Sequence, residues 1–143
     1  MRIPTPPKIL AAIRDRDRAK QLRHFVKSGQ MVVELAVVDS LRGAVARGGE
    51  AFDAIIVDGQ MVDEDHGYPM RQLRRAFPES AILLLDSNIS ESEAWYRLHV
   101  DEVVRGELNP VTLQRTIRAT IAWRLGALAA QGEIKTPTTG GPL

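Results

Sequence analysis

Short runs of apolar residues alternate along this chain with segments whose apolar residues recur every three or four positions. The runs are predicted to be strands, and they are Lys8–Ile13, Met31–Val38, Ala54–Val57, Ala81–Leu85 and Glu102–Val104. The third and fourth are continuously apolar, which is typical of strands buried on both faces of a parallel sheet. Ile9, Leu10, Ala54–Val57 and Ile82–Leu85 are therefore the predicted core.

The segments with helical spacing lie between these strands and after the last one. Their predicted starts are near Ala19, after a cap at Asp39 or Ser40, near Tyr68, after Ser90, and at Pro110. The stretch before the first helix, RDRD at residues 14–17, is predicted to be a charged turn. Strands that alternate with helices predict an α/β fold, with a doubly wound five-stranded parallel sheet and right-handed crossovers.

Length and composition agree with one domain, which we place at residues 8–130. Residues 1–7 hold three prolines and are predicted to be extended. Residues 131–143 contain Pro, Thr and Gly and are predicted to be a disordered tail or linker. With 44% apolar and 26% charged residues the chain has the profile of a globular protein.

Charge and residue usage exclude several classes of function. A net charge of +1 gives no bulk electrostatic case for nucleic acid or for an anionic membrane. The chain lacks cysteine, a leader-like segment at its start and any apolar run of about 20 residues, so we expect a cytoplasmic protein. The three histidines show no ligand spacing, and no metal site is predicted from them.

The most informative position is Asp58, which directly follows the apolar run Ala54–Val57. In open α/β sheets, ligands and chemistry collect at the carboxyl ends of the strands. Asp58 is therefore a candidate functional carboxylate. Asp is also a common turn residue, so a simple capping role stays open.

Two stretches resemble the receiver domain of bacterial response regulators. FDAIIVD, Phe52–Asp58, is similar to the strand that ends in the phosphate-accepting aspartate, and VVRGELNPVTLQRTIRATI at 103–121 is similar to receivers with Lys-Gly-Glu-Leu after the last strand. Receivers of that subfamily often precede sensor, kinase or cyclase modules. The resemblance extends from Lys8 to about Ala130 and implies a (βα)5 flavodoxin-like fold.

The resemblance assigns expected roles to individual positions, and this chain departs from most of them. Asp58 matches the phosphoacceptor. The pair of Mg²⁺-binding acids falls on Ile13 and Arg14, with Asp15 one place late. The other changed positions are Asp86 at the hydroxyl position with Ser87 beside it, Arg105 at the lysine position, and Glu102 at the aromatic switch position.

These changes favour a degenerate receiver that acts through protein–protein contacts, is not an enzyme and needs no cofactor. An Arg14–Asp58 ion pair is expected to replace the metal, unless Arg14 is simply solvated. An alternative is a receiver phosphorylated on Asp58 by a histidine kinase, with Mg²⁺, Asp15, Ser87 and Arg105 in support. A small α/β enzyme or nucleotide-binding domain is a further alternative, although no glycine-rich phosphate motif is present.

The final helix carries the expected contact surface for a partner, either a kinase, an output module or a second copy. Leu113, Ile117 and Ile121 are predicted to pack on the sheet. The residues predicted to form the interaction surface are Trp123, Leu125 and Leu128, together with Trp95 and Glu102. The alternative is that the last turns of this helix fray into the linker.

Overall fold

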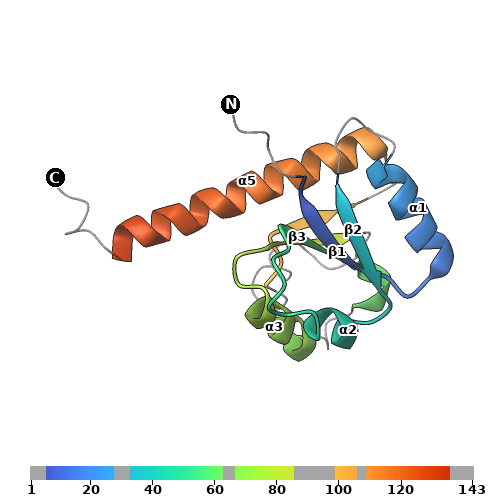
Figure 1. Cartoon of the computed structure of the whole chain (residues 1–143), viewed down its shortest axis with the longest axis horizontal. Coiled ribbons are helices and arrows are strands. Elements are labelled where there is room, and N and C mark those ends of the chain that lie inside the picture. The colour runs from blue at the N-terminus through green and yellow to red at the C-terminus, as the bar shows by residue number, and fades with distance from the viewer. Residues whose placement is uncertain (1–5, 28–32, 63–66, 86–98, 106–108, 136–143) are drawn as a thin grey trace.

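The computed structural model describes residues 6–27, 33–62, 67–85, 99–105 and 109–135. Its centre is a five-stranded, all-parallel sheet with strand order β2-β1-β3-β4-β5 (Figure 1). The strands are β1 (Lys8–Ala12), β2 (Glu34–Val38), β3 (Ala54–Asp58), β4 (Ala81–Leu85) and β5 (Glu102–Val104). The predicted doubly wound parallel sheet is confirmed.

Helices cover both faces of this sheet. The described helices are α1 (Arg16–Lys27), α2 (Leu41–Val45), α3 (Gly67–Ala76) and α5 (Pro110–Lys135), with a 3₁₀ turn η1 at Gly59–Met61. Helices α1 and α5 pack on one face, and α2 and α3 pack on the other (Figure 1). The short helix predicted after Ser90 lies outside the described residues.

The core divides into two layers because successive strand residues point to opposite faces. In β3, Ala54 and Ile56 face α1 and α5, whereas Ile55 and Val57 face α2 and α3. Every predicted core residue of β1, β3 and β4 is at most 1% exposed. The continuous apolar runs therefore do mark strands buried on both faces.

Two predicted helix boundaries were wrong. Helix α1 begins at Arg16 instead of near Ala19, because the Asp15 carboxylate accepts hydrogen bonds from the backbone N–H groups of Asp17 and Arg18 and so caps the helix. Helix α5 continues past residue 130 to Lys135. Its alanine-rich turns favour helix strongly enough to carry it through Gly132.

The amino end of the sheet is held by a partly buried arginine that the sequence did not single out. Arg74 of α3 donates to the backbone oxygens of Phe77, Ser80 and His99, and its Nη2 lies 2.7 Å from Asp101 Oδ2. Burial lowers the pKa of Arg74, and the carboxylate of Asp101 opposes that shift. The guanidinium thus ties α3 to the starts of β4 and β5.

Helix α5 is joined to the same cluster and then leaves the body of the molecule. Arg124 Nη2 donates to Pro78 O at 2.6 Å, and its Nη1 lies 3.6 Å from Asp101 Oδ1. Beyond this point the helix extends away from the sheet (Figure 1). No helix among the described residues is both long enough and apolar enough to cross a membrane.

Candidate functional site

Asp58 is the last residue of β3, and its side chain is 2% exposed. It continues the series Ala54 and Ile56, whose side chains point to the face covered by α1 and α5. The carboxylate therefore lies at the carboxyl end of the central strand, on the side where α1 begins. This is the strand end at which the sequence placed the candidate carboxylate.

A two-pronged ion pair occupies that carboxylate. Arg18 Nε donates to Asp58 Oδ2 and Arg18 Nη2 donates to Oδ1, both at 2.9 Å. The backbone N–H of Gln60 also donates to Oδ1, at 3.1 Å, which caps the η1 turn. Both oxygens of Asp58 are thus engaged, and the Arg18 side chain remains 22% exposed.

The capping of α1 explains why Arg18 reaches Asp58. Residues 18, 22 and 26 are four apart and lie on one face of a helix. Leu22 and Val26 are fully buried against the sheet. Arg18 extends the same face by one turn toward the carboxyl end of β3, so its guanidinium falls beside the only charged group buried there among the described residues.

The ion pair that the sequence assigned to Arg14 is therefore made by Arg18. Arg14 precedes the first turn of α1, is exposed, and lines a groove between α1 and β2 instead. Asp15 is also exposed, and one of its carboxylate oxygens is used to cap α1. The sequence signal that could have identified Arg18 is Asp15 as a helix cap. A helix that begins after Asp15 places Arg18, Leu22 and Val26 on one face.

The described residues at this strand end do not suit a divalent cation. Mg²⁺ prefers several oxygen ligands in near-octahedral geometry. Here the two carboxylates accept hydrogen bonds from a guanidinium and from helix N–H groups, as just described. In the part of the chain that the structure describes, no group of three or more acids or histidines could hold a metal.

The remaining predicted site residues fall partly outside the described part of the chain. Asp86, Ser87 and Trp95 lie outside the described residues, so their predicted positions stay predictions. Arg105 follows β5 and is exposed. Glu102 is half-buried, and its Oε1 accepts from the N–H of Val103 at 3.2 Å.

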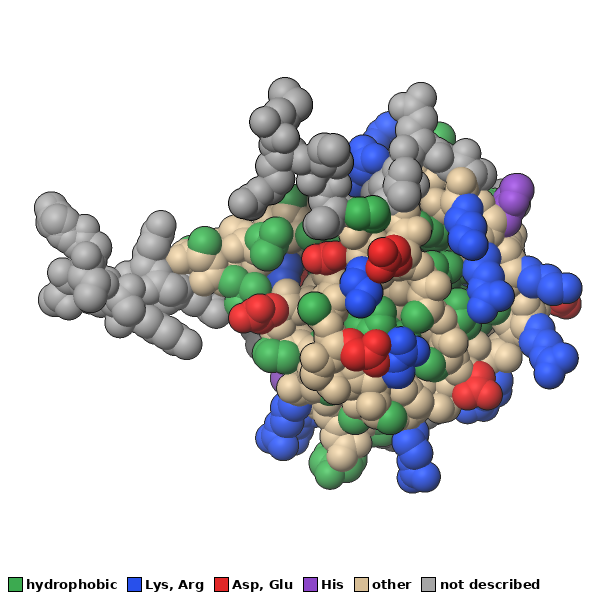
Figure 2. Space-filling model, in the orientation of Figure 1, with side chains coloured by type: hydrophobic (Ala, Val, Ile, Leu, Met, Phe, Trp, Pro, Cys, Tyr) green, Lys and Arg blue, Asp and Glu red, His purple; other side chains and the backbone are tan. Residues whose placement is uncertain are grey.

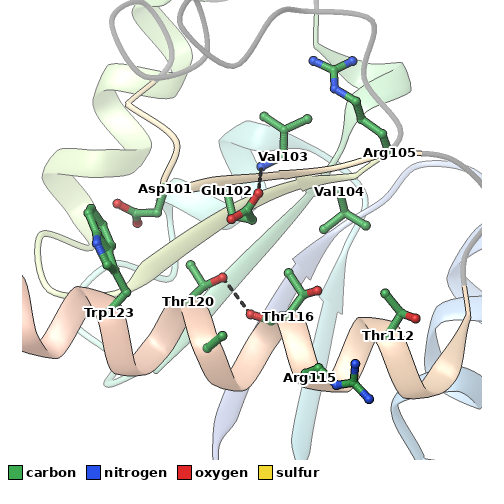
Figure 3. A pocket seen from close by; sticks show the side chains of 11 residues that line it. Asp101, Glu102, Val103, Val104, Arg105, Thr112, Arg115, Thr116, Thr120 and Trp123 are labelled. Carbon is green, nitrogen blue, oxygen red and sulfur yellow. Dashed lines mark hydrogen bonds between the residues drawn. The ribbon is translucent and has the colours of Figure 1, made fainter.

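Glu102 lies in a groove between β5 and the polar face of α5. The groove has a volume of about 680 Å³. Figure 3 shows Trp123 toward one end of this groove and Arg105 toward the other, with Thr116 and Thr120 of α5 facing β5 between them. Trp123 is 51% exposed. Two predicted interaction residues, Glu102 and Trp123, therefore share one surface.

No protein-family model matches the sequence, and no curated protein matches it. Solved structures do match. An adenylate cyclase structure from Rhodopirellula baltica superposes with a TM-score of 0.72 at 19% identity, over 92% of this chain and 99% of that chain. A second match is the receiver domain of a sensor histidine kinase from Pseudomonas aeruginosa PAO1, which has a magnesium ion coordinated in its active-site cleft. It superposes with a TM-score of 0.67 at 17% identity, over 82% of this chain and 99% of that chain.

A third similar structure is the chemotaxis response regulator CheY4 of Vibrio cholerae. It gives a TM-score of 0.67 at 22% identity, over 81% of this chain and 99% of that chain. These matches span most of this chain and nearly all of each matched chain. The chain therefore has the CheY-like fold of a response-regulator receiver domain.

Proposed function

We propose that this protein is a receiver-like signalling domain that works through protein–protein contacts and not through Mg²⁺-dependent phosphorylation. The observation that carries the proposal is the two-pronged Arg18–Asp58 ion pair at the strand end. It supplies a fixed internal cation at the place where a metal ion would otherwise balance the carboxylate.

The chemistry of phosphoryl transfer supports this assignment. The attacking carboxylate oxygen must be free to approach phosphorus in line, and cations must balance the charge that develops. In this chain each oxygen of Asp58 already accepts a charge-assisted hydrogen bond from Arg18, and Oδ1 accepts a further one from Gln60 N. Phosphorylation would require Arg18 to leave a nearly buried carboxylate.

The proposal is tested by incubation of the protein with acetyl phosphate and Mg²⁺, followed by intact-mass measurement. We expect no gain of a phosphoryl group. In parallel, calorimetric titration with Mg²⁺ should give no dissociation constant below the millimolar range, with the Pseudomonas aeruginosa receiver domain as the magnesium-binding control. A stoichiometric phosphoryl adduct that is lost in Asp58→Ala would establish the phosphorylated-receiver alternative.

The surface proposed to carry the signal is the projecting part of α5. The helix has 26 residues and is about 39 Å long at 1.5 Å per residue. Leu113 and Ile117 are fully buried against the sheet, whereas Leu125 is 60% exposed. A short helix without partners is only marginally stable in water, so a partner along these turns would stabilise them.

We propose a second copy of this chain as the occupant of that surface. Ile121, Leu125 and Leu128 recur at intervals of four and three, the spacing of a helix-pairing seam. Ile121 packs against the core and Leu128 is half-buried, so the seam starts on the body and continues along the projecting turns. Such a stripe is complementary to itself in a two-fold dimer.

Sedimentation equilibrium of Leu125→Glu tests the dimer, with Val111→Glu as the matched control. Val111 is an equally exposed apolar residue, 64% against 60%, at the other end of the same helix. We expect a dimer for the wild type and for Val111→Glu, and a monomer for Leu125→Glu. A wild-type monomer, or equal weakening by both substitutions, would refute the seam as the dimer contact.

A further inference from the structure

A second hollow opens at the carboxyl end of the sheet, beside a different face of α1 from the one that carries Arg18, Leu22 and Val26. It lies between α1 and the end of β2, and its volume is about 540 Å³. Its lining includes four basic side chains, Arg14, Arg16, Lys20 and Arg23, all exposed to solvent. We refer to it as the α1–β2 groove.

The basic residues of this groove share one face of α1. Residues 16, 20 and 23 are separated by four and by three positions, so their side chains lie one above another along the helix. Arg14 adds a fourth cation just before the first turn. Figure 2 shows basic side chains gathered on the side of the molecule where α1 lies in Figure 1.

Among the described residues, carboxylates do not pair with this stripe. Within the described part of the chain, none of the four basic residues forms an ion pair, and Asp39 is the one acidic residue that lines the groove. Like charges four residues apart destabilise a helix. Arg18, by contrast, is turned toward Asp58. The stripe therefore carries a cost to the helix for which an anionic ligand would compensate.

The remaining lining of the groove indicates more than a simple anion site. Ile13, Val37 and Val38 give it apolar walls, and Asp39 supplies a hydrogen-bond acceptor at the end of β2. A volume of this size suits a small ligand. Guanidinium groups recognise phosphate oxygens in pairs, and lysine adds a point charge.

We propose that the α1–β2 groove binds an organic phosphate of the nucleotide class. The phosphates would contact the basic stripe, and the ring system would lie against the apolar wall near Val37 and Val38. The acceptor at Asp39 suits a ring amino group or a sugar hydroxyl. This site is separate from Asp58, and the proposal does not depend on the function proposed above.

The test is a titration of the ¹⁵N-labelled protein, residues 1–143, followed by amide chemical shifts at constant ionic strength. The probes are ATP without Mg²⁺, AMP, inorganic phosphate and adenosine. We expect saturable shifts confined to residues 13–23 and 37–43, with affinity falling in the order ATP, AMP, phosphate, and no binding of adenosine alone.

Two charge-matched variants separate a site from general attraction. Arg16→Glu/Lys20→Glu changes two exposed cations four residues apart on α1, and Arg71→Glu/Arg75→Glu makes the same change on α3, away from the groove. We expect at least tenfold weaker ATP binding in the α1 variant and less than a twofold change in the α3 variant.

Several results would overturn the proposal. Equal weakening by the two variants would mean that only net charge matters. Inorganic phosphate bound as tightly as AMP would remove the nucleotide class. A hexaglutamate peptide that shifts the same amides at lower concentration than ATP would assign the groove to an acidic protein segment instead.

Discussion

The Arg18–Asp58 pair gives the sharpest test of the physical reasoning, because one partner is nearly buried and the other is not. The Asp58 side chain is 2% exposed and that of Arg18 is 22% exposed. Arg18→Met keeps the aliphatic stem but removes the charge, so among the described residues the buried carboxylate keeps only the Gln60 N–H as a donor. Asp58→Asn keeps the shape and leaves a guanidinium that can turn toward water.

The expected magnitudes follow from this asymmetry. Removal of one partner from a fully buried pair costs about 3–5 kcal/mol. Because Arg18 is partly solvated and one hydrogen bond to Asp58 survives, we expect a loss of about 2–3 kcal/mol of unfolding free energy for Arg18→Met. We expect about 1 kcal/mol for Asp58→Asn, and a double variant no less stable than Arg18→Met.

The measurement is a double-mutant cycle by urea denaturation at pH 7, monitored by circular dichroism. The coupling energy should be at least about 1 kcal/mol and should persist in 1 M NaCl, since a nearly buried pair is poorly screened. The chain offers an exposed reference pair, Arg47–Glu50, in which the hydrogen bond from Arg47 lowers the pKa of Glu50. The cycle with Arg47→Met and Glu50→Gln should show a smaller coupling that salt abolishes.

A coupling energy below about 0.5 kcal/mol between Arg18 and Asp58 would refute the conclusion that they form a strong, nearly buried ion pair. So would a salt dependence equal to that of the exposed pair. Either result would mean that the carboxylate is held by its backbone hydrogen bond and by solvent. The internal cation would then have no role in keeping a metal or a phosphoryl group away from Asp58.

Three further predictions concern the core and the amino end of the sheet. Ile56→Asp should unfold the domain, because an unpaired charge at a fully buried position costs several kcal/mol, roughly the whole stability margin; a native circular dichroism spectrum would contradict this. Arg74→Lys should lose about 2–3 kcal/mol of unfolding free energy, measured by urea denaturation, because an ammonium group cannot reproduce the forked contacts of the guanidinium with Ser80 O, His99 O and Asp101. A loss under about 1 kcal/mol would contradict this prediction. Burial and the nearby Arg71 and Arg74 lower the pKa of His99. The imidazole is therefore protonated at a higher pH in the unfolded chain than in the folded chain, and the free energy of unfolding should fall as the pH drops below about 6.5. His99→Asn, which tolerates the backbone φ of 56°, should lose less urea stability between pH 7.5 and 5.5 than the wild type, and an equal loss would refute the assignment.

The sequence alone determined the order of the described strands and helices, because each is a local property of spacing. The bounds predicted for β4 and β5 agree with the structure to the residue. Continuous apolar runs also identified the strands that are buried on both faces. The position of Asp58 at the end of a core strand followed from the same run, since the apolar residues stop there.

Helix ends were predicted less well, because they depend on side-chain hydrogen bonds. The choice between Asp39 and Ser40 as the cap of α2 was left open, and the structure shows that Ser40 accepts the hydrogen bond from Gly43 N. The capping role of Asp15 was missed, which moved the predicted start of α1 by three residues. That shift hid the helical face on which Arg18 lies.

Only the tertiary structure decided which arginine meets Asp58. The two residues are 40 positions apart, and no local pattern links them. Their contact depends on the alternation that turns Asp58 toward α1, on the cap that sets the start of that helix, and on the packing of Leu22 and Val26 that fixes its rotation. The same holds for Arg74, whose partners lie on separate segments that meet only after the sheet has formed. The local spacing of apolar residues specifies whether each segment is a strand or a helix. Which charged residues pair across segments depends on how those segments pack together.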